Sequence, residues 1–370
     1  MFSFFRLRVR EGFPFLPVAL VLAIFSFGFL QLYSAGGGMQ PWALPQLLRF
    51  GGACLLFFIV AFVDLRFWLA SAAVFYVVGL LLLVLVELLG ATGMGAKRWI
   101  NLYVMQLQPS EVMKFALVLF LASYFHLLGE KGGRIRSTFV PLLAIGVSAL
   151  LVLRQPDLGT AIILIASGLT ILFVAGVSWW FFIGGGTFLL GLMPILWHYL
   201  KPYQKKRIFT FLNPEADPLG AGYHTLQSKI AIGSGGLWGK GFGGGTQVQL
   251  SFLPEKQTDF IFTVLCEEWG FWGAGLLIFL YLGLVFYGYW VALHCHARFT
   301  KLLVVGTTST LFAHVFVNIG MVMGVLPIVG VPLPLMSYGG TALLTFMGGV
   351  GWLVAADRQR RVRLPLSGME

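Results

Sequence analysis

The chain of 370 residues is 58% hydrophobic and 11% charged, and its 25 basic and 14 acidic residues give a formal net charge of +11. Soluble globular domains carry about 25% charged residues, so this composition excludes a soluble enzyme. In so apolar a chain, the basic excess favours anchoring at an anionic membrane face over nucleic-acid binding. The three cysteines match no metal or disulfide spacing. The sequence therefore predicts a polytopic integral membrane protein.

Apolar runs long enough to cross a bilayer recur along the chain, since a transmembrane helix needs about 20 apolar residues. The first run follows a short basic segment and is too long for a cleaved signal, so we expect a retained signal-anchor helix. The predicted fold class is all-α, a single membrane domain over residues 1–370 with about ten transmembrane helices. The predicted spans are 13–35, 42–63, 67–89, 109–128, 138–153, 158–178, 179–200, 259–293, 302–326 and 335–356.

Basic residues in the short connections set the orientation, because positively charged loops stay on the inner side of a membrane. With the N-terminus inside, thirteen basic residues lie in inner segments and only four in short outer connections. The outer segments are then 91–108, 154–157, 201–258 (the long outer loop, between spans 7 and 8) and 327–334. Nearly every unusual polar cluster falls in these segments, so we expect the chemistry at the outer face.

The long outer loop holds seven basic residues and is rich in glycine. A connection of this length is uncommon and tends to be functional. Gly239, Gly241 and Gly244 fit the spacing GxGxxG, but no strand precedes them, which excludes a dinucleotide site. Glycines beside Lys240 can present backbone N–H groups to a phosphate, and a plain flexible loop is an equal alternative. A short helix is expected near 225–233.

Asp259 opens the apolar run that follows the long outer loop. One interpretation makes Thr258 the helix cap and puts Asp259 in the first turn, where a carboxylate is favoured. The other is a carboxylate partly desolvated at the membrane boundary, whose raised proton affinity suits a general base. Glu267 and Glu268 lie about two turns deeper, where an ionisable group is either functional or paired within the bundle.

A second polar cluster surrounds the start of the fourth span. Lys97, Arg98 and Trp99 suit either an anionic ligand or an aromatic-belt anchor. In the segment that follows, Ser110 is expected to cap a helix starting near Glu111.

In that fourth span, Glu111 and Lys114 are three residues apart and so share a helical face. Their pairing lowers the cost of two charges in lipid, so a structural ion pair is at least as favoured as a substrate contact.

Two further clusters interrupt the apolar runs near the outer face. One is the run from Arg154 through Asp157, and the other spans residues 330–340 and includes Ser337. Broken helices at membrane depth are tolerated only where the backbone is buried or lines a wet cavity. The two breaks therefore predict a cavity open to the outer side. The six histidines show no metal-ligand spacing, so no histidine metal site is expected.

Taken together, these motifs resemble the SEDS family of membrane glycosyltransferases, named for shape, elongation, division and sporulation. Within the family, the sequence of the long outer loop is most similar to that of the members that serve cell elongation, rather than to that of the members that serve division. The residues that carry the likeness are Lys97-Arg98-Trp99, Gln108-Pro109-Ser110-Glu111, Gln155-Pro156-Asp157-Leu158-Gly159, Gln227-Ser228, Leu253-Pro254-Glu255, Thr258-Asp259-Phe260, Pro332-Leu333-Pro334 and Ser337-Tyr338-Gly339-Gly340.

The resemblance implies a peptidoglycan glycosyltransferase that polymerises lipid II into glycan strands at the outer face of the bacterial cytoplasmic (inner) membrane. It implies a class B penicillin-binding protein, a transpeptidase, as partner, and membership of the elongation machinery. Lipid II and undecaprenyl pyrophosphate are the implied ligands, with no nucleic acid. Asp259 matches the family's essential aspartate.

In the expected reaction Asp259 takes the proton from the acceptor's 4-hydroxyl, which attacks C1 of the donor sugar as undecaprenyl pyrophosphate leaves. The leaving group needs charge neutralisation, for which Lys97, Arg98, Arg207 and Lys240 are candidates. A divalent cation, Mg²⁺ or Mn²⁺, that bridges the pyrophosphate and Asp259 or Glu255 is compatible with these residues, although no pattern specifies one. Other residues expected near substrate are Trp99, Glu111, Lys114, Arg154, Asp157, Gln227, Ser228, Glu255 and Ser337.

Two alternatives from other classes stay open. Broken helices and the intramembrane pair Glu111 and Lys114 are also typical of a lipid II flippase or ion-coupled transporter. A non-catalytic scaffold for the penicillin-binding protein fits the apolar surface but gives the outer basic residues no role. Polar clusters confined to one side of the membrane favour the enzyme.

Overall fold

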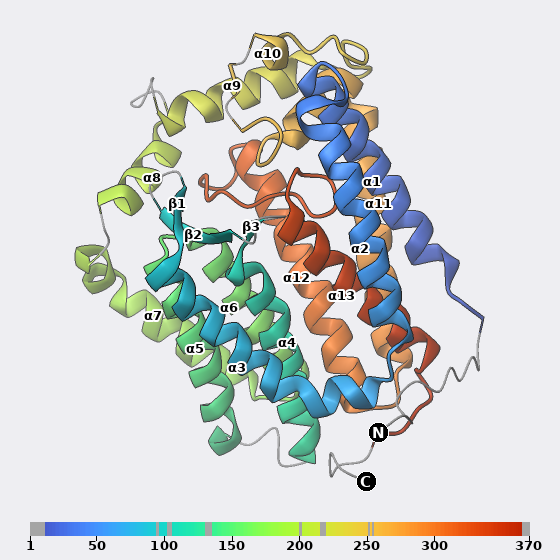
Figure 1. Ribbon diagram of the computed structural model, residues 1–370. Coiled ribbons are helices and arrows are strands. Elements are labelled where there is room, and N and C mark those ends of the chain that lie inside the picture. The colour runs from blue at the N-terminus through green and yellow to red at the C-terminus, as the bar shows by residue number, and fades with distance from the viewer. Residues whose placement is uncertain are drawn as a thin grey trace.

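Helices dominate the computed structural model (Figure 1). The first turn of α1 and the last turn of α13 lie at one end of the bundle, and α9 and α10 lie at the other. By the predicted orientation, the end that carries α9 and α10 is the outer one. The structure describes residues 12–93, 96–101, 106–129, 135–199, 202–214, 220–250, 252–253 and 255–364.

Each predicted span contains one apolar helix, which confirms a polytopic, all-α membrane fold. Among the described residues, seven helices are long and apolar enough to cross a membrane. They are α1 (Phe15–Gly36), α2 (Leu44–Phe62, entered through the π-helical turn Met39–Ala43), α3 (Leu65–Leu89), α4 (Pro109–Leu127), α11 (Ile261–His294), α12 (Arg298–Val322) and α13 (Gly340–Arg358). Shorter apolar helices are α5 (Phe139–Arg154), α6 (Leu158–Val174) and α7 (Trp179–Tyr199, apolar over Trp179–Ile195). Because these three have shorter apolar stretches, the number of ten spans stays a prediction.

The core lies around α4 and α12. In α4, 78% of the most apolar stretch is buried, and in α12 67%, against 33% in α3. The helices approach closely at small residues, as is usual in membranes. A Cβ at Gly306 of α12 would lie 2.6 Å from side-chain atoms of both Val118 and Ile171, in α4 and α6. Large apolar side chains on the outside, such as Phe286, 74% exposed, suit contact with lipid.

A small antiparallel sheet leads into α4, where the sequence analysis expected only a connection. Its strands are β1 (Ala91–Gly93), β2 (Ala96–Asn101) and β3 (Gln106–Leu107), in the order β1-β2-β3. The strands are too short to show a recognisable alternation, and their lysine and arginine suggested a membrane anchor instead. The sheet lies at the upper ends of α3 and α4, below the level of α9 and α10 (Figure 1).

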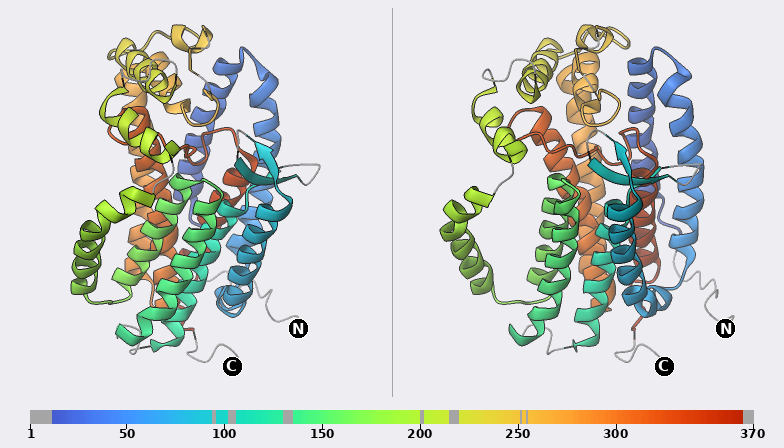
Figure 2. Two further views of the ribbon diagram at one scale, coloured as in Figure 1. Left: turned by 90° about the vertical axis from the view of Figure 1, so that its left-hand side faces the viewer. Right: turned by 60° about the vertical axis from the view of Figure 1, so that its left-hand side comes forward.

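The long outer loop is largely helical. It contains α8 (Pro202–Leu212), α9 (Ala221–Ser234) and α10 (Thr246–Gln249). Helix α9 confirms the helix expected near 225–233. Figure 2 shows α9 and α10 at the upper end of the molecule, and α7 and α8 to one side of the bundle.

Candidate functional site

Asp259 lies in the turn that leads into α11, so it is not in the first helical turn. The N-cap of α11 is Phe260, which makes no side-chain cap bond. Thr258 is therefore not the cap: its hydroxyl donates to the carbonyl of Glu255 at 3.3 Å and to the Glu255 carboxylate at 3.2 Å. The chain turns sharply at Glu255, whose φ is +53°, and this brings Thr258 back onto it. The capping interpretation of Asp259 is thus wrong.

Three consecutive backbone carbonyls fix the position of Asp259. The carbonyls of residues 257, 258 and 259 accept hydrogen bonds from the Tyr338 backbone N–H (2.8 Å), the Ser337 hydroxyl (2.6 Å) and the Asn318 amide (2.9 Å). The donors belong to α12 and to the irregular segment before α13. The predicted break near Ser337 is thereby explained, because it supplies the contacts that hold the turn before α11.

Asn318 is a site residue that was not predicted from the sequence. Its side chain is fully buried in α12, and its amide also donates to the carbonyl of Val331 at 2.7 Å. An asparagine inside an apolar run was the available signal, since a polar side chain in a span is usually functional or paired. It joins α12 to both loops that border Asp259.

The carboxyl group of Asp259 binds its proton unusually tightly. Burial, and then the carboxylates of Glu255 and Asp157, raise its pKa to about 7, against the opposing effect of Arg207 and Arg98. Desolvation disfavours the charged form, and like charges act in the same direction. A pKa near neutrality suits a general base, because about half of the groups are then deprotonated near pH 7 and the carboxylate is a stronger proton acceptor than an ordinary aspartate.

Asp157 and Arg98 connect the sheet to the break between α5 and α6. Asp157 is buried and caps α6 by accepting from the Thr160 N–H at 3.2 Å, and its second oxygen accepts from the Gln108 amide at 3.3 Å. Arg98 donates through Nε to the carbonyl of Gln155 at 2.9 Å and through Nη2 to the carbonyl of residue 156. The cluster predicted at residues 154–157 is therefore a junction at which hydrogen bonds join the sheet to the break between α5 and α6.

Four other residues proposed for substrate contact differ in their solvent exposure. Arg207, on α8, is partly buried and its charge acts on Asp259. Trp99 is also partly buried, whereas Lys97 and Arg154 are exposed.

The predicted pair in α4 is confirmed and extends to a histidine. The Lys114 ammonium lies 2.7 Å from the Glu111 carboxylate and 2.5 Å from His314 Nε2. His314 Nδ1 lies 2.9 Å from the carbonyl of Thr310 and so donates to it, which leaves Nε2 to accept from Lys114. All three side chains are buried. Ser110 does not cap this helix, which begins at Pro109 after the N-cap Gln108.

Lys240 and Ser228, two of the residues predicted in the long outer loop, contact other groups than Asp259. Lys240 pairs with Glu267 at 2.7 Å. The Ser228 hydroxyl is buried between Thr263 and the carbonyl of Val322, at 2.8 Å from each. Gln227 is partly buried on α9. Lys240 and Ser228 therefore hold helices together in this structure.

Few residues near Asp259 are suited to bind a cation. Among the described residues, no group of three or more His, Cys, Asp or Glu side chains is arranged to hold a metal ion. Asp259 and Glu255 supply two neighbouring carboxylates, the kind of partial oxygen site that Mg²⁺ completes with water and substrate phosphates. These two residues fit such an ion only together with a phosphate ligand.

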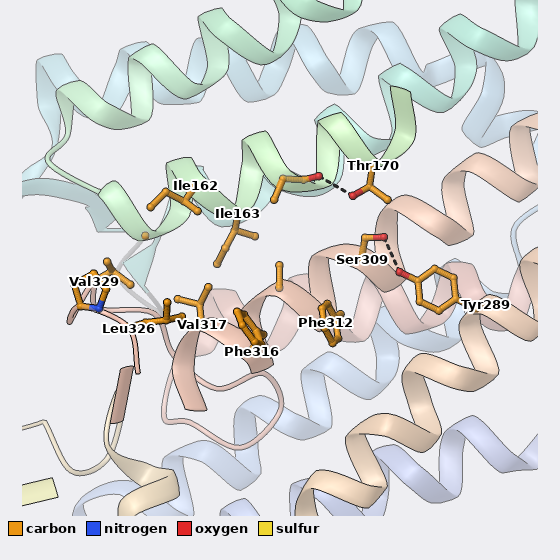
Figure 3. A pocket seen from close by; sticks show the side chains of 14 residues that line it. Ile162, Ile163, Thr170, Tyr289, Ser309, Phe312, Phe316, Val317, Leu326 and Val329 are labelled. Carbon is orange, nitrogen blue, oxygen red and sulfur yellow. Dashed lines mark hydrogen bonds between the residues drawn. The ribbon is translucent and has the colours of Figure 1, made fainter. Parts of the chain in front are cut away.

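An apolar groove of about 500 Å³ lies between α6, α11 and α12 (Figure 3). It begins near Val329, beside the Gly330 backbone that faces Asp259, since a Cβ at Gly330 would lie 3.5 Å from Asp259 Oδ2. At its other end the hydroxyl groups of Tyr289 and Ser309 lie 3.0 Å apart. The lining residues include Ile162, Ile163, Phe312, Phe316, Val317 and Leu326. The groove thus runs along the helices from the neighbourhood of Asp259.

Comparison with known proteins identifies the family. A family model for the FtsW, RodA and SpoVE cell cycle proteins matches residues 14–362. The peptidoglycan glycosyltransferase MrdB of Escherichia coli (strain K12) is 42% identical over 93% of each chain. Stage V sporulation protein E of Bacillus subtilis (strain 168) is 37% identical over 94% of this chain and 97% of its own.

Solved structures agree with this assignment. A chain from a peptidoglycan synthase complex that coordinates polymerization and crosslinking is 33% identical, with a TM-score of 0.83 over 94% of this chain and 98% of its own. The rod shape determining protein RodA of Thermus thermophilus is 30% identical, with a TM-score of 0.73 over 95% of this chain and 99% of its own. The matches confirm the resemblance drawn from the motifs. The chain belongs to the SEDS family of FtsW, RodA and SpoVE proteins.

Proposed function

We propose that this chain is a peptidoglycan glycosyltransferase, a single membrane domain over residues 1–370 that polymerises lipid II at the outer face of the bacterial inner membrane. Membership of the family, and the glycosyltransferase activity for which its relative MrdB is named, support the reaction. One observation carries the assignment to this site: Asp259, with a pKa of about 7, is held by its backbone beside Arg98, Arg207 and the mouth of an apolar groove.

Asp259 acts as the general base. Its carboxylate takes the proton of the 4-hydroxyl of the acceptor sugar, and that oxygen forms a bond to C1 of the donor sugar. The bond from C1 to the pyrophosphate oxygen breaks, and the electron pair leaves with undecaprenyl pyrophosphate. Attack opposite the leaving group turns an α-linked donor into a β-linked product. One carboxylate is sufficient, because a pyrophosphate leaves without the protonation that a glycosidase must supply.

Arg98 and Arg207 neutralise the departing pyrophosphate. A guanidinium has five N–H donors, and the two backbone bonds of Arg98 leave three of them for phosphate oxygens. Lys97 and Arg154 are exposed nearby and contribute charge. Lys240 is a weaker candidate, because its ammonium already lies 2.7 Å from the Glu267 carboxylate.

The apolar groove receives the first part of the polyprenyl tail. Its lining is almost entirely hydrocarbon, and its mouth adjoins Asp259 through Val329 and Gly330. The tail moves from lipid into an equally apolar groove, so van der Waals contact and shape, rather than withdrawal from water, hold it there and keep the sugar at the site.

A class B penicillin-binding protein is the proposed partner. The related chain in the peptidoglycan synthase complex works where polymerization and crosslinking are coordinated. The likeness to MrdB and RodA extends this role to cell elongation. A transpeptidase at the same face receives each glycan strand as it forms.

Polymerisation of labelled lipid II by the purified chain in proteoliposomes tests the function. We expect glycan strands from the unaltered chain, and a loss of at least about 10²-fold in rate for Asp259→Asn. Asp64→Asn is the matched control: Asp64 caps α3 at the inner end, and asparagine caps a helix equally well. Full activity of Asp259→Asn excludes the base. Lipid II translocation without polymer supports a transporter, and neither product nor translocation supports a scaffold.

A further inference from the structure

Helix α11 is broken near its outer end. At Gly270 the backbone has φ +64° and ψ −158°, values that no residue of an α-helix adopts. The break separates the short outer segment Ile261–Trp269 from the membrane-spanning part Phe271–His294. A break of this kind leaves helical carbonyl and N–H groups without their usual partners, and such groups are costly when they are buried in a membrane protein.

A glycine-rich segment of the long outer loop, residues 235–245, supplies the missing partners. The N–H groups of residues 240 and 241 donate to the carbonyls of Glu267 and Glu268, each at 3.0 Å. Across the break, the N–H groups of residues 271 and 272 donate to the carbonyls of residues 236 and 237, at 2.9 and 3.3 Å. The segment therefore binds both sides of the break and joins them.

The glycines are required by this close approach. A Cβ at Gly239 would lie 2.1 Å from the carbonyl oxygen of Glu268, and one at Gly235 would lie 2.0 Å from that of Cys266. At the break itself, a Cβ at Gly270 would lie 2.4 Å from the backbone nitrogen of Gly239. Since these contacts are with backbone atoms, no side chain can move aside to relieve them. The segment that suggested a phosphate loop is thus shaped to fit against α11.

Side chains lock the same segment in place. Lys240 Nζ lies 2.7 Å from Glu267 Oε1, which also accepts from the Thr246 hydroxyl and the Gln247 N–H, each at 3.1 Å. The Glu267 side chain is fully buried and that of Lys240 is 27% exposed. The neighbouring Glu268 accepts a hydrogen bond from Ser34 of α1. Both acidic residues of the helix are therefore engaged in holding the outer segment.

We propose that Lys240 and Glu267 are positioning residues for glycan polymerisation. Their ion pair holds the glycine-rich segment across the break in α11 and so fixes the direction of the outer segment 261–269, which begins two residues after Asp259. The ammonium of Lys240 serves this contact and leaves the pyrophosphate to the arginines. The inference rests on the proposed role of Asp259 in catalysis, and it adds to that role the residues that position the Asp259 carboxylate.

A positioning role and a phosphate-binding role predict different kinetics. Loss of a phosphate contact weakens lipid II binding and raises KM. Loss of the Lys240–Glu267 ion pair (the lock) leaves the phosphate contacts intact but displaces the general base Asp259. It therefore lowers kcat with KM nearly unchanged. If the ion pair has a positioning role, Glu267→Gln should have the same effect as Lys240→Met. If Lys240 bound a phosphate instead, Glu267→Gln should not weaken binding, because the Glu267 carboxylate repels a phosphate. Because the two residues act as one unit, the double variant is expected to be no worse than either single variant.

The experiment measures kinetics and backbone exchange on the purified full chain carrying Lys240→Met, Glu267→Gln, both changes, or Lys240→Arg. We expect amide hydrogen exchange to rise by roughly tenfold in peptides covering residues 236–241 and 268–272, because breaking an ion pair whose carboxylate is fully buried frees the segment that it holds. We expect kcat to fall by about tenfold with KM within about twofold, and Lys240→Arg to restore most of both. Lys229→Met, which removes an exposed charge from the same loop, is the matched control and should change neither.

Two outcomes overturn the inference. A raised KM with unchanged exchange in Lys240→Met makes Lys240 a phosphate ligand. Raised exchange with unchanged kcat makes the pair structural only. Failure of the proposed function is recognised separately, by an Asp259→Asn variant that polymerises at the normal rate. If the unaltered chain forms no polymer, unchanged exchange in these variants still refutes the lock.

Discussion

Opposing charges act on Asp259 in a site that is largely withdrawn from water. Burial and two carboxylates favour the protonated form, and the two arginines favour the charged form, with a resulting pKa of about 7. Removing one of the carboxylates or one of the arginines therefore changes the pKa of Asp259. Each unit of pKa corresponds to about 1.4 kcal/mol of difference between the two protonation states.

The pH dependence of polymerisation follows from this balance. Only deprotonated Asp259 accepts the hydroxyl proton, so kcat should rise with pH through a midpoint near 7. About one-tenth of the groups are deprotonated one unit below the midpoint and about nine-tenths one unit above it, so kcat at pH 6 should be about tenfold below kcat at pH 8. Initial rates with saturating lipid II measure this.

Glu255→Gln is the companion variant for the pH profile. The Glu255 carboxylate raises the pKa of Asp259, so its neutralisation should move the midpoint to lower pH while the rate at pH 8 stays nearly constant. A profile that is flat between pH 5 and 8 in the unaltered chain, or a midpoint that moves upward in Glu255→Gln, contradicts the assigned base.

Asn318→Leu should slow the reaction more than it weakens binding. The variant keeps the side-chain volume but removes the donors to two carbonyls, one of them that of Asp259. Loss of about 1–3 kcal/mol of hydrogen bonding at the turn should lower kcat by about tenfold to a hundredfold with little change in KM.

Ser123→Ala is the control for Asn318→Leu. It removes a buried hydroxyl that donates to the carbonyl of Leu69 at 3.3 Å, far from the outer face. A similar loss of thermal stability with normal kcat is expected for Ser123→Ala. Equal kcat losses in both variants would show that Asn318 supports only the general fold.

At the level of elements, apolar runs predicted the helices well and the breaks in them only in part. The interruption at Asp157 was visible because proline and charged residues mark it. The break at Gly270 was not, since a lone glycine inside an apolar run is usually tolerated. It becomes intelligible only when the segment around Gly239, about thirty residues earlier in the sequence, is seen against it.

The glycine contacts predict a graded loss of stability. Gly239→Ala places a Cβ against the Glu268 carbonyl at a φ of +77°, so it combines backbone strain with a clash. Gly241→Ala has a φ of +91° but open space around the Cβ. We expect Gly241→Ala to cost about 1–3 kcal/mol for its backbone conformation alone, and Gly239→Ala to cost more.

Thermal unfolding of the purified protein in one detergent compares the two glycine variants. The unaltered chain and Gly51→Ala, whose Cβ would meet nothing within 4 Å in α2, are the references. Gly51→Ala should be neutral or slightly stabilising, because alanine favours a helix. Equal stability of Gly239→Ala and Gly241→Ala would contradict the close fit of the glycine-rich segment to α11.

At the level of the whole molecule, the sequence predicted the membrane fold, the family and the pairing of Glu111 with Lys114, but not which of the other candidates meet. Arg98 and Asp157 reach the neighbourhood of Asp259 through hydrogen bonds that join distant segments. Lys240 and Ser228 carry residue types that suit a ligand, yet the tertiary structure uses them between helices. Charge and sequence position alone do not distinguish these uses.

The orientation of the whole bundle is testable by labelling. In a chain whose own cysteines, Cys54, Cys266 and Cys295, are replaced by alanine, a cysteine at exposed Lys229 should react with a membrane-impermeant maleimide in intact spheroplasts. A cysteine at exposed Arg66, at the opposite end of the bundle, should react only after the membrane is permeabilised. The reverse pattern would put Asp259 on the cytoplasmic side and exclude polymerisation at the outer face.

The most direct measurement is a cryo-EM structure of the Asp259→Asn variant with lipid II bound. We expect the 4-hydroxyl of an acceptor sugar within about 3 Å of the residue 259 side chain, a donor pyrophosphate beside Arg98 and Arg207, and the polyprenyl tail in the groove between α6 and α12. Lipid II bound with its sugars remote from residue 259, or with its pyrophosphate on Lys240, would contradict the proposed chemistry.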